Sequence, residues 1–99
     1  MADFHPPWFE PRTPTAEDCV GPRLIDRFAA ETPDAVFIRF ETGETWTWAE
    51  TRLKALETAA ALQARGVRPG DVVAAWVPNG ATLVRSWFGA NYAGAALAP

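Results

Sequence analysis

Apolar residues recur at helical spacing in three segments of the sequence. In residues 22–31, Leu24, Ile25 and Phe28 fall on one side of a helix, while polar residues occupy the other side. The Thr-Pro-Asp sequence of residues 32–34 ends this short amphipathic helix. The same kind of spacing returns in two later segments, so the sequence predicts three helices.

The second helix carries signals at both ends. Thr47 and Glu50 form a Thr-x-x-Glu capping box, in which each side chain accepts a hydrogen bond from the other residue's backbone amide. The helix is expected to run to about residue 65, because Gly66 suits the left-handed conformation that ends many helices. Between these ends, apolar residues at spacings of four, three and four are expected to form one apolar face. These residues are Ala49, Leu53, Leu56 and Ala60.

The third helix is expected over residues 81–92 and is predicted to be largely buried. Its apolar residues share one face, and Gly94 closes it. The residues of this face are Leu83, Val84, Trp87 and Phe88.

Apolar runs without a helical period predict strands. Residues 35–40 are rich in β-branched and aromatic side chains, and a turn containing Gly43 leads back into residues 45–47, which predicts a hairpin. Residues 72–77 are apolar without alternation, as expected for an interior strand of a parallel sheet covered by helices on both faces. Residues 95–99 read as the start of one more strand.

The predicted fold class is therefore α/β: a hairpin followed by helix, strand, helix and strand. Because an interior strand has only one predicted sheet neighbour after it, we expect an incomplete part of a larger layered domain. Five prolines remove backbone donors within residues 1–22, which predicts an extended leader. Residues 23–99 are expected to form the α/β unit. The PxxP sequence at residues 11–14 could bind an aromatic groove, but chance occurrence is the favoured interpretation.

Composition excludes several function classes. The 99 residues carry a formal net charge of −3, which argues against a nucleic-acid partner. Cys19 is the only cysteine and His5 the only histidine, so neither an internal disulfide nor a Cys/His metal cage is possible, and a cytoplasmic location is expected. No apolar stretch is long enough to predict a membrane span or an export signal.

Candidate catalytic chemistry is sparse. Cys19 and His5 lie far apart in the leader, which is a poor arrangement for a nucleophile and its base. No Gly-rich phosphate-binding motif occurs, and although Asn79-Gly80 could offer backbone amides to an anion, a simple turn is the favoured reading. We therefore predict no catalytic, cofactor-binding or metal-binding residue in this chain.

Five tryptophans raise the alternative of stacking platforms for bases or sugars. Trp76 lies in an apolar strand and Trp87 on an apolar helix face, so core packing is the favoured interpretation. Trp46 and Trp48 flank Thr47 and are expected to pack where the hairpin meets the second helix.

The order of the turn and cap motifs resembles the start of the adenylate-forming superfamily, which includes acyl-CoA synthetases, peptide-synthetase adenylation domains and luciferases. The resemblance covers residues 24–99, with Trp48 where the family usually has tyrosine and Thr51 where leucine is common. The motifs are Thr32-Pro33-Asp34, Gly43 with Thr47-Trp48-Ala49-Glu50, Gly66, Pro69-Gly70-Asp71, Pro78-Asn79 and Gly94.

Within that superfamily the sequence is most similar to an acyl-CoA synthetase. The resemblance implies the N-terminal piece of an AMP-forming acyl-CoA ligase, which in full length would use ATP, Mg²⁺ and coenzyme A to convert a carboxylic acid into a thioester. The family's phosphate loop and catalytic lysine lie downstream of such a segment, so this chain is expected to be inactive alone. The alternative is a non-catalytic binding or assembly module that pairs with another chain through its open sheet edge and the apolar surfaces of Trp76, Trp87 and Phe88.

Overall fold

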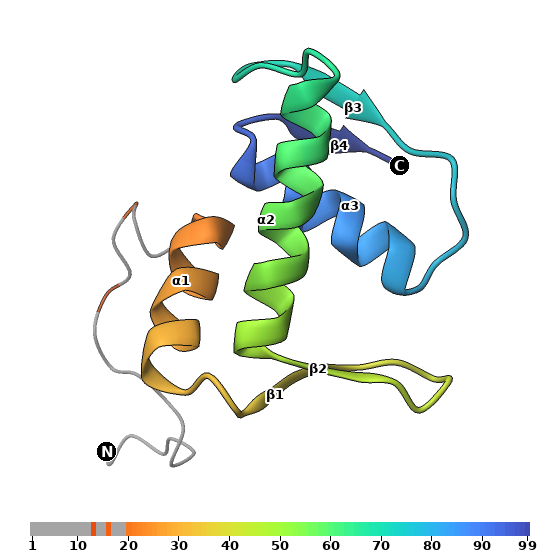
Figure 1. Ribbon diagram of the computed structural model, residues 1–99. Coiled ribbons are helices and arrows are strands. Elements are labelled where there is room, and N and C mark those ends of the chain that lie inside the picture. Colours follow the sequence, from red (N-terminus) through yellow and green to blue (C-terminus); the bar gives the residue numbers. More distant parts are fainter. Residues whose placement is uncertain (1–12, 14–15, 17–19) are drawn as a thin grey trace, which may run out of the picture.

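A computed structural model describes Thr13, Ala16 and residues 20–99. Seventeen of the 22 residues of the predicted leader lie outside the described residues, and its last two, Gly21 and Pro22, are helical. The described part contains three helices and four short strands in the predicted order (Figure 1). The elements are α1 (Gly21–Glu31), β1 (Val36–Arg39), β2 (Thr45–Thr47), α2 (Trp48–Ala64), β3 (Val72–Ala74), α3 (Ala81–Tyr92) and β4 (Ala96–Ala98).

The predicted hairpin is confirmed as an antiparallel pair of β1 and β2, in which Ile38 lies opposite Trp46. Gly43 makes the turn with φ of +94°, a conformation that costs glycine little. Trp46 is almost fully buried, and its ring meets Phe40 edge to face at a centroid distance of 4.9 Å. The Lys54 ammonium of α2 lies 5.3 Å from the centroid of the Trp46 ring, so Trp46 connects the hairpin to α2.

The junction between the hairpin and α2 follows the sequence prediction. The amide of Glu50 donates to Thr47 Oγ1 at 3.1 Å, and the amide of Thr47 donates to Glu50 Oε1 at 3.3 Å. Trp48, the first residue of α2, stacks on Phe37 at 3.7 Å and on Phe28 at 4.7 Å between ring centroids. These rings pack β1 and α1 against the start of α2.

The expected apolar face of α2 is not its buried face. Leu53 is 59% exposed, whereas Thr51 is 1% exposed and donates its hydroxyl to the carbonyl of Thr47 at 2.8 Å. Ala55 and Ala59 share the buried side with Thr51. Small residues occupy the buried face of α2 because α2 packs closely on α3. A Cβ added at Gly89 of α3 would lie 2.5 Å from Thr58 Cγ2 of α2. Figure 1 shows α2 running from the hairpin to the second strand pair.

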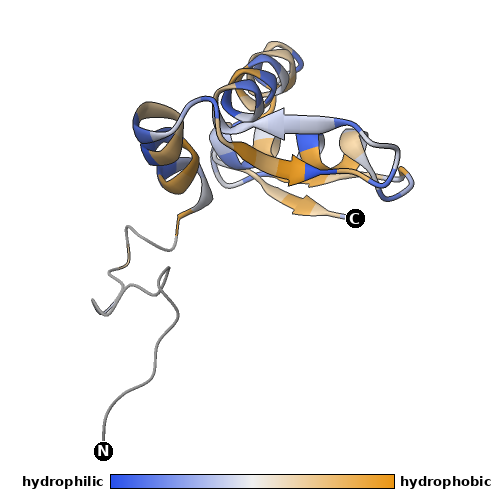
Figure 2. Cartoon of the chain, turned by 90° about the horizontal axis from the view of Figure 1, so that it is seen from below, coloured by the Kyte–Doolittle hydropathy of each residue, from blue (hydrophilic) through white to orange (hydrophobic). Residues whose placement is uncertain are grey.

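The second strand pair consists of β3 and β4, which are parallel as predicted, with Val72 opposite Ala96. The expected strand over residues 72–77 is too long, because β3 ends at Ala74, although the amide of Ala75 still donates to Ala98 at 2.9 Å. The expectation that helices cover both faces is also wrong for the described residues, since Val72 is 68% exposed. Figure 2, coloured by hydropathy, shows that β4, the strand beside the C-terminus, is hydrophobic.

Candidate functional site

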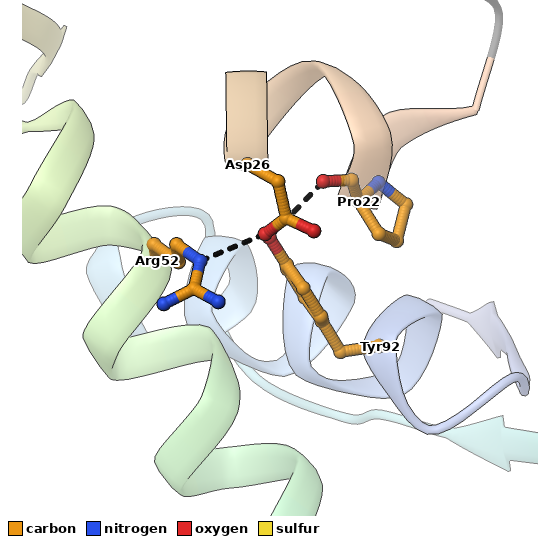
Figure 3. A network of polar contacts seen from close by, with 4 residues as sticks. All are labelled: Pro22, Asp26, Arg52 and Tyr92. Atoms are coloured by element: carbon orange, nitrogen blue, oxygen red, sulfur yellow. Dashed lines mark hydrogen bonds and ion pairs between the residues drawn. The ribbon is translucent and has the colours of Figure 1, made fainter. Parts of the chain in front are cut away.

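Three polar side chains, one from each helix, converge between the helices and form the polar network (Figure 3). Asp26 of α1 accepts a hydrogen bond on Oδ1 from Arg52 Nε of α2 at 2.8 Å. The hydroxyl of Tyr92, at the end of α3, donates to the same oxygen at 2.6 Å. The carbonyl oxygen of Pro22 lies 3.1 Å from that hydroxyl and is the alternative acceptor for its single proton. The polar network therefore connects all three helices through one carboxylate.

The protonation of the polar network suits a structural role. Burial raises the pKa of the Tyr92 hydroxyl, and its hydrogen bond to the Asp26 carboxylate raises it further. For Asp26, burial acts to raise the pKa, but hydrogen bonds from Tyr92 and Arg52 outweigh it, and the pKa falls below 3.8. At neutral pH the phenol is neutral and the carboxylate is ionised, so neither group is ready to exchange a proton. The network fixes helix positions and is poorly suited to acid–base catalysis.

A second polar contact links α2 to α3. Arg85 donates from Nε to Thr58 Oγ1 at 2.9 Å and from Nη2 to Glu57 Oε2 at 2.8 Å. The ion pair is about half exposed, so its contribution to stability is small, of the order of 0.2–1 kcal/mol. Its main effect is to orient the two helices at their crossing.

The carboxyl ends of β3 and β4 form an open groove, which is the place where α/β sheets usually bind ligands. Only apolar residues line it: Ala74, Ala75, Trp76, Val77, Ala98 and Pro99. Trp76 is fully exposed, which contradicts the prediction that it packs in the core. No ionisable side chain lines this groove, so it offers an apolar docking surface and no acid, base or nucleophile.

A smaller cavity lies between α3 and β4. Leu83, Trp87, Leu97 and Pro99 line about 50 Å³ of apolar space, far below the ~300 Å³ of a typical small-molecule site. Trp87 is 53% exposed, so the prediction that it belongs to the core is also wrong. Pro99 lines both this cavity and the groove.

The other sequence candidates do not form a site in the described residues. Cys19 and His5 lie outside them. Gly80 precedes α3 with φ of +151°, which fits the turn reading of Asn79-Gly80. Within the described residues, no three His, Cys, Asp or Glu side chains are close enough to hold a metal ion. None of the helices described in residues 20–99 could cross a membrane.

Sequence reasoning missed the polar network entirely. Asp26 and Tyr92 are 66 residues apart, and each alone reads as an ordinary polar residue on a helix. The one available signal was the position of Tyr92 beside Gly94, where α3 ends. Nothing in the sequence pairs it with α1.

Residues 25–99 match the family described as AMP-binding enzyme. The chain is 42% identical over 73 residues to phenyloxazoline synthase MbtB of Mycobacterium sp. (strain MCS), which covers 74% of this chain. It is 44% identical over 68 residues to 4-coumarate–CoA ligase 2 of Oryza sativa subsp. japonica, which covers 68% of this chain.

Solved structures of adenylate-forming enzymes share the fold. The fatty acyl-adenylate ligase of L. pneumophila matches with a TM-score of 0.68 and 30% identity over 77% of this chain. The N-terminal subdomain of Klebsiella oxytoca NpsA matches with a TM-score of 0.72 and 24% identity over 79% of this chain, which supports the fold alone.

The chain spans only a small part of these relatives: 6% of MbtB, 12% of the rice ligase and 14% of the L. pneumophila ligase. The α/β fold corresponds to part of the N-terminal domain of adenylate-forming enzymes, as the resemblance implied. Because the family match extends over residues 25–99, the chain belongs to the AMP-binding enzyme family.

Proposed function

We propose that residues 25–99 form one flank of the adenylating domain of an AMP-forming acyl-CoA ligase. In this reaction the carboxylate of the acid attacks the α-phosphate of ATP, and pyrophosphate leaves. The thiol of coenzyme A then attacks the acyl-adenylate, and AMP leaves as the thioester forms. ATP, Mg²⁺ and coenzyme A belong to the complete enzyme in this proposal.

The observation that carries the proposal is the family match over residues 25–99, together with 44% identity to a CoA ligase over 68 residues. A CoA ligase of Rhodococcus jostii, named for a propanoyl substrate, is 46% identical over 55 residues. Both relatives are named as CoA ligases, which supports thioester formation as the second step.

In the proposed enzyme this chain contributes structure and supplies no catalytic group. The groove at the ends of β3 and β4 carries no ionisable side chain, and in the polar network Asp26 stays ionised and Tyr92 stays protonated at neutral pH. The phosphate-binding and catalytic groups are therefore expected from residues outside the described part. The 99-residue chain alone is proposed to be inactive.

The proposal is tested on the native polypeptide, captured with an antibody raised against the 99-residue chain. We expect acid-dependent exchange of labelled pyrophosphate into ATP, followed by release of AMP and a CoA thioester when coenzyme A is added. The purified 99-residue chain, assayed in parallel, is expected to give no exchange. Absence of exchange with a broad panel of carboxylic acids, in native material of confirmed identity, would overturn the proposal.

The relatives also include the synthetases MbtB and PchE, so the test must identify the thiol that accepts the acyl group in the second step. If the native polypeptide performs pyrophosphate exchange but loads the acyl group onto a carrier-protein thiol and not onto coenzyme A, adenylation stands and CoA ligation is wrong. Mass spectrometry of the acylated product separates the two outcomes.

A second candidate function is a non-catalytic assembly module that retains the enzyme scaffold. The full exposure of Trp76 favours it, because an exposed tryptophan beside an apolar groove is typical of a protein–protein contact. A native polypeptide of 99 residues, isolated in a stable complex with another protein and inactive in exchange, would favour this candidate over the ligase.

A further inference from the structure

The loop of residues 75–80 joins β3 to α3 and lies at the edge of the molecule in Figure 1. Its last two residues, Asn79 and Gly80, form a turn, and Asn79 is exposed to solvent. This pair places a side-chain amide directly before a glycine, which has no Cβ to crowd its backbone nitrogen. An asparagine in this position can react with the neighbouring backbone without an enzyme.

The reaction is an attack by the backbone nitrogen of Gly80 on the side-chain carbonyl carbon of Asn79. The nitrogen loses its proton to a base in the solvent, the new C–N bond closes a five-membered succinimide ring, and the side-chain nitrogen leaves as ammonia. Water then opens the ring at one of its two carbonyl carbons. Opening at the side-chain carbon gives aspartate. Opening at the main-chain carbon gives isoaspartate, in which the backbone runs through the former side chain.

The structure leaves this reaction open in the folded chain. Among the described residues, the Gly80 amide donates no hydrogen bond, so no such contact has to break before the nitrogen attacks. A Cβ built at Gly80 would meet nothing within 4 Å, so no other side chain crowds this position. The exposure of Asn79 gives the base and the water access to it.

Asn91, the other asparagine of the chain, is in the opposite environment. It is half-buried near the end of α3. The next amide, that of Tyr92, lies within the helix, where an amide is hydrogen-bonded to the preceding turn. Ring closure at Asn91 would break the last turn of α3, so the structure predicts different reactivity for the two asparagines.

Deamidation at Asn79 would change the charge of a region that has none. Residues 72–80 contain no ionisable side chain, and the groove beside them is lined by none. A carboxylate at position 79 would precede Gly80, the N-cap of α3, and this helix has no acidic residue in its first turn. A negative charge near this end of a helix is favourable, so we expect the fold to tolerate the aspartate product.

We propose that Asn79 is a site of spontaneous deamidation in the folded protein, which converts it to isoaspartate and aspartate and adds one negative charge to the loop before α3. This modification does not depend on the proposed function, because it needs only this chain and water.

The test follows the purified 99-residue chain during long incubation at neutral and mildly alkaline pH. Peptide mapping by mass spectrometry measures conversion at Asn79 and at Asn91. We expect conversion at Asn79 to be at least tenfold faster than at Asn91, with isoaspartate and aspartate both present. The rate should rise with pH, because the attacking nitrogen must lose its proton. A smaller ratio, a rate that does not rise with pH, or conversion without isoaspartate would overturn the proposal.

Asn79→Gln is the matched variant. It keeps the exposed side-chain amide, but its extra methylene group requires a six-membered ring, which closes more slowly. Ion-exchange chromatography measures the accumulation of the more acidic form of the chain. We expect this form to accumulate at least tenfold more slowly in Asn79→Gln than in wild type. A smaller difference would place the charge change at another residue and overturn the proposal.

A comparison with the chain unfolded in guanidinium chloride separates the effect of the fold from that of the dipeptide sequence. Because Asn79 is exposed and the Gly80 amide has no partner among the described residues, we expect the folded chain to react at Asn79 at no less than a tenth of the unfolded rate. Stronger protection in the folded chain would show that the loop holds the pair away from ring closure, and the proposal would then be wrong.

Discussion

The hydroxyl of Tyr92 and Oδ1 of Asp26 are 2.6 Å apart and join the last turn of α3 to the first half of α1. The same carboxylate oxygen receives Arg52 of α2 at 2.8 Å. A single side chain of α1 thus contacts both other helices. This contact complements the ring stack between Phe28 and Trp48, which holds α1 to α2 by apolar packing.

Replacing Tyr92 with phenylalanine removes the hydroxyl and leaves the ring in place. We expect the free energy of unfolding to fall by about 1 kcal/mol, the typical value of one intramolecular hydrogen bond. Urea unfolding of the 99-residue chain measures it. Arg27→Gln is the control, because it breaks an exposed i, i+4 pair with Glu31 on the same helix and should cost no more than ~0.5 kcal/mol. Equal losses in the two variants would contradict a special role for the Tyr92 contact.

Acid should weaken the polar network. The pKa of Asp26 in the folded chain is lower than its ordinary 3.8, because hydrogen bonds from Tyr92 and Arg52 outweigh the effect of burial. The unfolded state therefore binds a proton more tightly, and the stabilisation is fully present well above pH 3.8 and lost as the pH falls through the folded pKa. Urea unfolding of wild type and Asp26→Asn should converge in that acid range. A constant difference down to the lowest pH would contradict the assignment.

Alkali should weaken the same contact from the other side. Burial and the adjacent Asp26 carboxylate raise the pKa of Tyr92 above its ordinary 10.0. The folded state then holds the phenolic proton more tightly, so the stabilisation is complete below pH 10.0 and declines as the pH rises above it. The absorbance of the phenolate reports the titration directly. Ionisation at the ordinary pKa in the folded chain would show that the hydroxyl is not engaged with Asp26.

The features predicted correctly from the sequence depend on residues within a few positions of one another. The capping box joins Thr47 to Glu50, three residues away, and the turn at Gly43 needs only a residue that tolerates positive φ. The parallel pairing of residues 72–74 with 96–98 was also predictable, because two strands joined by one helix usually lie parallel in the same sheet. Local chemistry was sufficient for each of these elements.

The failures involve surfaces chosen by distant partners. Leucine at position 53 outranks threonine at position 51 in hydrophobicity, yet Thr51 is buried and Leu53 exposed, because the α2–α3 crossing requires small side chains. Trp76 and Trp87 are expected in a core because they lie in an apolar segment and on an apolar helix face, but in the structure Trp76 is fully exposed and Trp87 is 53% exposed. The polar network was invisible because its members come from three separate helices.

Gly89 is required where α3 crosses α2. A methyl group added there would lie 2.5 Å from Thr58 Cγ2 and 2.6 Å from Thr58 Cβ, so Gly89→Ala should push the helices apart and lower the free energy of unfolding by about 1–3 kcal/mol. Gly21→Ala is the matched control, because the nearest atom to its added methyl is 3.8 Å away, an ordinary contact distance. Thermal unfolding compares the two. A Gly89→Ala variant as stable as Gly21→Ala would contradict the close crossing.

Replacing a buried and an exposed tryptophan tests which of the two side chains stabilises the folded chain. Trp46 is 3% exposed and donates from Nε1 to Glu44 at 3.1 Å, so Trp46→Ala should lower the free energy of unfolding by about 3–5 kcal/mol. Trp76 is fully exposed, and Trp76→Ala should change that free energy by no more than ~0.5 kcal/mol while reducing the binding of an apolar dye such as ANS. Urea unfolding and dye fluorescence measure the two effects. A large loss of stability in Trp76→Ala would mean that some part of this chain already covers the groove, and the exposed apolar region would then need no partner.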